Sequence, residues 1–185
     1  MATTCRLLLV SGSLRRLSTN SAALRTAQRV APPGTEAVLY EGLRGLPPFD
    51  PDDDVEPLAP EVAALRDAVH RAAAIVFSTP EYAGALPGSF KNLLDWTIGD
   101  DQPGSIYEKP VAWVNTSPRG AAGAHGELRT VLGYAHASII EEACCSVPVT
   151  SAMVGADGYI ADQATVDRLA EVLRAVAAAA ARRGS

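Results

Sequence analysis

The chain has 185 residues, 48% of them hydrophobic, and a formal net charge of −5. This length and composition predict one globular domain over residues 1–185, because two domains would each have a cramped core. The acidic balance argues against nucleic acid as a partner, since duplex binding needs a basic face. No apolar run approaches the ~20 residues that span a bilayer. Residues 1–9 lack the features of a signal peptide, so we expect a cytoplasmic protein with no membrane partner.

Short apolar runs alternate with helical patterns along the chain. Strands are predicted in five runs of branched or apolar residues, at 6–10, 36–40, 74–77, 111–114 and 139–145. Helices are predicted from capping residues and one-sided apolar patterns, at 18–30, 60–72, 89–96 (capped by Ser89), 127–137 and 166–183. The segment 41–58 is rich in Pro, Gly and Asp and is predicted to be a loop. Five alternating strands and helices indicate an α/β fold with a parallel sheet covered on both faces.

The loop after the first strand reads SGSLRRLSTN over residues 11–20. It leads into a helix N-terminus, where backbone N–H groups and the helix dipole favour an anion. Hydroxyls of Ser11, Ser13 and Ser18 and the guanidinium of Arg15 add donors for a phosphate. The alternative is an ordinary turn with capping serines. Neither a Walker A motif nor Gly-x-Gly-x-x-Gly is present.

The loop after the third strand contains Pro80, Pro87 and several small residues between them. Prolines restrict the backbone, and small residues let it approach a flat ligand closely. A purely structural strand-to-helix connection explains these residues equally well. In a parallel sheet, ligands bind beyond the carboxyl ends of the strands, so the loops after the first, third and fourth strands are the places to look for a site.

Two linked motifs make the sequence resemble a known family. GSLR at 12–15 is followed by STN at 18–20, and PEY at 80–82 by PG at 87–88, KN at 91–92 and DW at 95–96. Over residues 7–160 the chain is similar to the NAD(P)H-dependent FMN reductases, which include bacterial quinone, chromate and azo reductases. The resemblance implies a flavodoxin-like three-layer sandwich with a five-stranded parallel sheet of order 2-1-3-4-5. It also implies FMN as cofactor and NADPH or NADH as co-substrate.

The resemblance further implies which residues hold the flavin. The FMN phosphate is expected at the first loop, on Ser13, Arg15, Ser18 and Asn20, with Ser11 and Thr19 beside them. The isoalloxazine ring is expected between the third and fourth loops, at Pro80, Glu81, Tyr82, Ala83, Gly84, Ser117, Gly120 and Gly123. Family members often have Asn where this chain has Ala83, which leaves the substrate preference open. We expect no essential catalytic side chain and no metal, because the flavin carries the chemistry.

Several residues near the expected site allow more than one interpretation. His125 is either a proton donor to a reduced quinone or, as its setting favours, an ordinary loop histidine. Arg119 is equally consistent with a contact to reduced flavin, a contact to the phosphates of NADPH, or simple exposure. The aromatic residues Trp96, Tyr82 and Tyr107 fit the family's habit of forming dimers. We therefore expect a homodimer through the helix around Trp96, and leave a tetramer open.

The resemblance favours a ping-pong reductase that passes a hydride from NAD(P)H through FMN to a small acceptor. That acceptor would be a quinone, a free flavin, an azo dye or a metal oxyanion. A flavodoxin-type electron carrier without reductase turnover is the alternative, and a flavin-free protein that kept only the fold is a third interpretation. Small residues in the third loop leave a ring face open, which favours the reductase.

Overall fold

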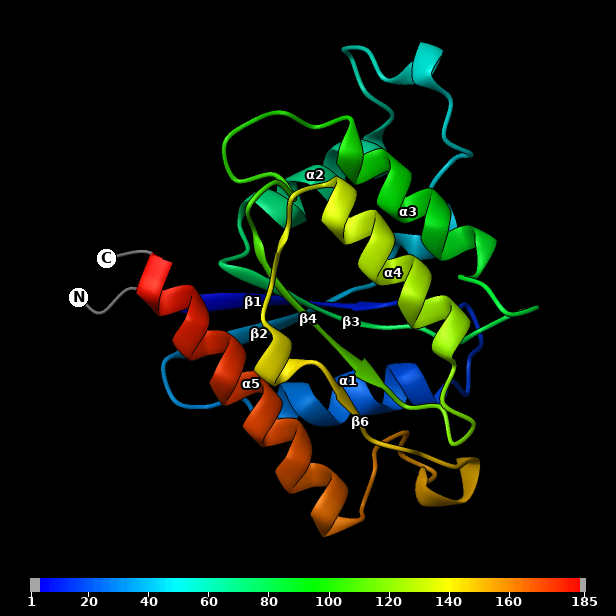
Figure 1. The fold of residues 1–185 in the computed structure, drawn as a ribbon, viewed down its shortest axis with the longest axis vertical. Coiled ribbons are helices and arrows are strands. Elements are labelled where there is room, and N and C mark those ends of the chain that lie inside the picture. Colours follow the sequence, from blue (N-terminus) through cyan, green and yellow to red (C-terminus); the bar gives the residue numbers. More distant parts are fainter. Residues whose placement is uncertain (1–3, 184–185) are drawn as a thin grey trace.

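A parallel β-sheet forms the middle layer of the molecule, with helices on both of its faces (Figure 1). The computed structural model describes residues 4–183; residues 1–3, part of the segment expected to lack a signal peptide, and residues 184–185 lie outside the description. The strands are β1 (Cys5–Ser11), β2 (Thr35–Tyr40), β3 (Ala74–Ser78), β4 (Pro110–Asn115), β5 (Ser138–Ile139) and β6 (Cys145–Ser146). Their order is β2-β1-β3-β4-β5, with β6 also paired to β4. The flavodoxin-like order expected from the sequence is confirmed.

The side chains of β1, β3 and β4 alternate between two hydrophobic cores, because successive residues of a strand point to opposite faces. On one face, Leu8, Ile75 and Val111 lie in a core with residues of α2 (Pro60–His70), α3 (Gly88–Ile98) and α4 (Ala122–Tyr134). On the other face, Leu7 and Val76 lie in a core with α1 (Thr19–Arg29) and α5 (Gln163–Arg183). Both faces are buried, which explains the continuous apolar runs in these strands.

The predicted fifth strand at 139–145 is wrong. The chain leaves the sheet after β5, forms a short 3₁₀ helix at Glu141–Ala143, and returns as β6 beside the far end of β4. Glu141 and Glu142 are exposed and interrupt the apolar pattern. Short, interrupted edge strands of this kind discourage pairing with a second sheet.

Two helix starts also differ from the sequence-based expectation. α3 begins at Gly88 with Pro87, not Ser89, in the capping position. α4 begins at Ala122, five residues before the predicted start. Its first turn is stabilised by Glu81, whose Oε2 accepts a hydrogen bond from the Ala124 backbone at 3.0 Å. That carboxylate is more than forty positions away in the chain, so no local pattern around residue 122 signals it.

None of the helices within residues 4–183 is both long and apolar enough to cross a bilayer. Over the same residues, no group of three or more His, Cys, Asp or Glu side chains is arranged to hold a metal ion.

Candidate functional site

A cleft of about 580 Å³ lies at the carboxyl edge of the sheet, where the predicted loops meet. Its walls come from the loops after β1, β3 and β4 and from the segment after β6. The cleft therefore lies where a doubly wound sheet is expected to bind its ligand. Of the residues predicted for the site, the cleft is lined by Ser13, Arg15, Ser18, Thr19, Asn20, Pro80, Glu81, Tyr82 and Ser117.

The loop after β1 is joined to the ends of β3 and β4 by one buried side chain, Asn20. Its Oδ1 accepts hydrogen bonds from Ser78 Oγ and from Thr116 Oγ1, both at 2.9 Å. Next to it, Ser18 caps α1 by accepting a hydrogen bond from the Ser21 backbone at 3.3 Å. These contacts hold the helix N-terminus against the cleft, with its backbone N–H groups at the positive end of the α1 dipole.

The cleft is lined by two cationic side chains and one acidic side chain. The guanidinium groups of Arg15 and Arg119 make no hydrogen bond or ion pair with the described part of the chain, and both residues are exposed. Glu81, the acid, is already engaged by the Ala124 backbone. Its charge complements the N-terminus of α4 rather than either arginine. The cleft thus offers two free cations to an anionic ligand in a protein of net charge −5.

The tip of the loop after β3 turns back on itself outside the cleft lining. The backbones of Tyr82 and Ala85 exchange two hydrogen bonds of 3.1 Å, with Ala83 and Gly84 at the tip in left-handed conformations. Ala83 and Gly84 are exposed and do not line the cleft. The carbonyl oxygen of Gly84 rests on Gly123, where an added Cβ would lie only 2.0 Å from it. Gly123 is therefore the point at which this loop packs against α4.

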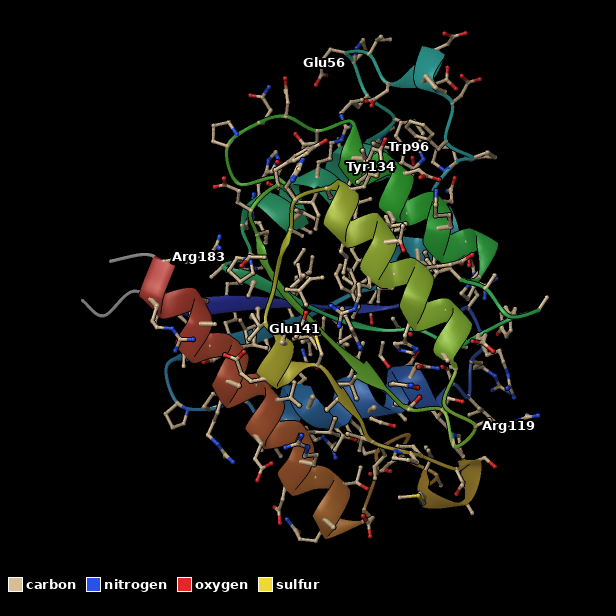
Figure 2. All side chains as sticks on the ribbon, in the orientation of Figure 1. Glu56, Trp96, Arg119, Tyr134, Glu141 and Arg183 are labelled. Carbon is tan, nitrogen blue, oxygen red and sulfur yellow. The ribbon has the colours of Figure 1, made fainter. Side chains whose placement is uncertain are left out.

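The loop after β4 is a rigid turn that carries Arg119 (Figure 2). The Asn115 carboxamide accepts a hydrogen bond from the Ser117 backbone at 3.0 Å and donates one to the Gly120 carbonyl. Ser117 Oγ accepts one from the Arg119 backbone at 3.2 Å. Gly120 has a φ of +89°, which closes the turn. Gly120 and Gly123 themselves lie outside the cleft lining, as does Ser11, whose hydroxyl is 2.8 Å from that of Ser21.

His125 does not line the cleft. Its Nδ1 donates a hydrogen bond to the Ala121 carbonyl at 2.8 Å, and its ring lies 6.4 Å from that of Trp113. Burial lowers the pKa of His125, so its neutral form is favoured at neutral pH. This setting favours the interpretation of His125 as a structural residue of α4.

Trp96, in the helix expected at a dimer contact, has a buried side chain. Its side chain is 1% exposed and packs edge-on against Phe49, with 4.9 Å between the ring centroids. Its Nε1 donates to the Pro47 carbonyl at 2.9 Å. The 41–58 loop covers the Trp96 side chain, whereas Tyr82 and Tyr107 are exposed. The homodimer through the helix around Trp96 stays a prediction.

Sequence reasoning missed one wall of the cleft entirely. After β6 the chain continues beside the end of β4, with the Val149 backbone donating to the Thr116 carbonyl at 2.9 Å. The alternating Val147 and Val149, both buried, are the signal that this segment extends the sheet. The lining residues not predicted are Leu17, Thr79, Thr116, Pro118, Ala121, Val149, Thr150 and Ser151. Arg119, for which the sequence left a flavin contact, a contact to the phosphates of NADPH and simple exposure open, also lines the cleft.

Comparison with known proteins agrees with this geometry. A family model described as NADPH-dependent FMN reductase matches residues 5–152. An NAD(P)H-dependent FMN reductase of Pseudomonas aeruginosa is 33% identical over 135 residues, 72% of each chain. A quinone reductase of Escherichia coli K12 is 32% identical over 170 residues, 89% of each chain.

The solved structure of FerB, an NAD(P)H:(acceptor) oxidoreductase from Paracoccus denitrificans, has the same fold. It superposes with a TM-score of 0.82 at 26% identity, covering 96% of this chain and 98% of FerB. The family expected from the motifs of the first and third loops is confirmed, and with it an enzyme type that uses FMN with NAD(P)H as electron donor. The chain belongs to the NADPH-dependent FMN reductase family.

Proposed function

We propose that this protein is a ping-pong reductase that uses NAD(P)H to reduce a small acceptor, with FMN held in the 580 Å³ cleft. The observation that carries the proposal is the meeting of both family motifs at one cleft, with the unpaired Arg15 beside the N-terminus of α1. FMN, when bound, accepts a hydride from nicotinamide and passes two electrons to the acceptor.

The residues present fit FMN. A phosphate suits the start of α1, where Ser13, Ser18 and Thr19 supply hydroxyls and Arg15 a free cation. A flat ring suits the space between the loops after β3 and β4, where Pro80 and Ser117 face the cleft. The volume is within the ~300–1,000 Å³ of small-molecule sites.

The remaining predicted site residues do not line the cleft but belong to or adjoin the loops that form its walls. Ala83 and Gly84 form the tip of the third loop, while Gly120 closes the turn that carries Arg119. Gly123 lets the Gly84 carbonyl approach α4. We propose that these residues, together with Ser11, shape the walls rather than contact the cofactor through side chains.

The composition of the cleft favours a reductase over an electron carrier. Tyr82 is the one aromatic side chain in its lining, so no pair of aromatic rings is positioned to stack on both sides of a flavin. A second flat molecule then has access to the ring. The quinone reductase of E. coli supports a quinone as acceptor; free flavins, azo dyes and metal oxyanions share the requirement for an open face.

We propose a homodimer in the cytoplasm as the working form. The contact would run through α3, the helix around Trp96, whose own side chain is buried, and the exposed Tyr82 and Tyr107 offer further aromatic surface.

Anaerobic reduction of the FMN-bound protein tests the function. Addition of NADPH or NADH should bleach the flavin, and a quinone added afterwards should restore its colour. Steady-state kinetics should then give the parallel lines of a ping-pong scheme. If neither nicotinamide bleaches the flavin while a separate reductase protein does, the electron-carrier alternative is correct. Protein that binds no flavin would support the flavin-free interpretation.

A further inference from the structure

The two free guanidinium groups of the cleft stand out against the other arginines of the chain. Most exposed arginines elsewhere are paired, as in the ion pairs of Arg129 with Glu141 and of Arg168 with Glu171. Within residues 4–183, Arg16 and Arg174 are also unpaired, but neither lines the cleft. Arg15 and Arg119 have no such partner within residues 4–183, and they reach the cleft from different loops. The acid in the lining, Glu81, is bonded to α4 and neutralises neither. Two separate positive positions therefore face one cleft.

The backbone of Arg119 is fixed although its side chain is free. The hydrogen bonds of Asn115 and Ser117 lock the turn, and Ala121 is held in a left-handed conformation with a φ of +45°. Ala121 is buried, so the end of the turn is anchored in the protein. A ligand that pairs with Arg119 has to order its side chain but not its loop, which reduces the entropy lost on binding.

In a protein of negative net charge, a second cation at the cleft favours the binding of a second anionic ligand. With a net charge of −5, the chain as a whole repels anions. FMN brings one phosphate, and a nicotinamide dinucleotide always brings a pyrophosphate. Arg15, beside the N-terminus of α1, is placed for the first of these. Arg119, which lines the cleft from the loop after β4, is free for the second.

We propose that Arg119 is a binding residue for the electron donor and pairs with phosphate groups of the nicotinamide dinucleotide; this inference rests on the proposed function. Arg119 is exposed, so its side chain stays accessible to a ligand that enters the cleft after FMN. A contact with reduced flavin is the alternative, and it predicts a loss of FMN affinity when Arg119 is changed. A neutral quinone has no charge for Arg119 to bind. Arg119 therefore affects the donor and leaves a neutral acceptor unaffected.

The test compares Arg119→Gln and Arg119→Lys with a control, Arg174→Gln. Arg174 is an exposed arginine of α5 and does not line the cleft. Arg174→Gln removes one positive charge, as Arg119→Gln does. Binding of NADP⁺ and of NAD⁺ to each FMN-bound protein is measured by calorimetry, and the FMN affinity by flavin fluorescence. The oxidised dinucleotides give a binding readout independent of turnover.

We expect Arg119→Gln to weaken NADP⁺ binding by about tenfold, the scale of one charge-assisted hydrogen bond. Arg119→Lys should recover part of the loss, and Arg174→Gln should show none. Equal losses for NADP⁺ and NAD⁺ identify the pyrophosphate as the partner, and a loss for NADP⁺ alone identifies the 2′-phosphate; either result supports the inference. Salt should weaken wild-type binding more than binding by Arg119→Gln.

Unchanged affinity for both dinucleotides in Arg119→Gln would overturn the inference. So would a loss of FMN affinity as large as the loss of dinucleotide affinity, since Arg119 would then belong to the flavin site. Reoxidation by a neutral quinone that slows in Arg119→Gln would also contradict it. In each of these cases the wild-type protein still binds FMN, and NADPH still bleaches the bound flavin. If the wild-type protein does not bind FMN, or NADPH does not bleach the bound flavin, the proposed function is refuted instead.

Discussion

Gly123 provides a sharp test of how the third loop is held beside the cleft. In Gly123→Ala the new Cβ would lie 2.0 Å from the Gly84 carbonyl oxygen and 2.8 Å from its carbon. Both are backbone atoms, so the loop has to move by roughly 1.4 Å to reach ordinary van der Waals distance. Such a shift also strains the bonds of Glu81 to the Ala124 backbone and of Glu127 to the Leu86 backbone.

Two opposing effects determine the size of the change. Overpacking costs about 1–3 kcal/mol, whereas alanine is better than glycine inside a helix by about 0.8–1.0 kcal/mol. The net expectation for Gly123→Ala is a loss of up to about 2 kcal/mol in the free energy of unfolding. Gly126, in the same helix, has open space where its Cβ would be. Gly126→Ala should therefore stabilise the protein by up to about 1 kcal/mol.

Urea unfolding of the two variants and the wild type, with and without FMN, measures this difference. The two matched variants should differ by about 2 kcal/mol at unchanged m-value. Gly123→Ala should also bind FMN more weakly, because the loop that moves carries Pro80 and Tyr82 at the cleft. If Gly123→Ala is as stable as Gly126→Ala and binds FMN like the wild type, the packing argument is refuted.

Arg15→Ala should weaken FMN binding about tenfold or more, the loss of a charge-assisted contact; a calorimetric affinity equal to that of the wild type would place the phosphate elsewhere. Burial lowers the pKa of Lys109, which donates to the Val69 and Ala72 carbonyls, to about 8. Between about pH 8 and 10.4 the unfolded chain then binds more protons than the folded chain. The stability of the wild type relative to Lys109→Met should therefore rise with pH across that window. If the difference between their thermal unfolding temperatures does not change with pH, the lowered pKa is contradicted. Light scattering at micromolar concentration should give the mass of two chains, and a monomeric mass would count against the proposed dimer.

Much of the fold follows from local patterns. Continuous apolar runs indicate burial on both faces, as in β1, β3 and β4. One-sided apolar patterns indicate burial on one face, as in α1, α2 and α5. Each segment carries this information by itself. Alternating strands and helices then imply the sheet and the edge at which a ligand binds. The motif loops after β1 and β3 were likewise recognisable, and the residues at 13–20 and 80–82 that were expected at the site do meet in the cleft.

Contacts between distant segments had to come from the tertiary structure. Glu81 stabilises the start of α4, and the 41–58 loop covers Trp96. Residues 149–151 form the last wall of the cleft. Asn20 looks like one more capping residue in the sequence, but its buried oxygen joins the ends of β3 and β4. A periodic pattern shows which face of a segment is buried. It does not show which residues of other segments pack against that face, because this depends on how separate strands and loops are arranged in the folded chain.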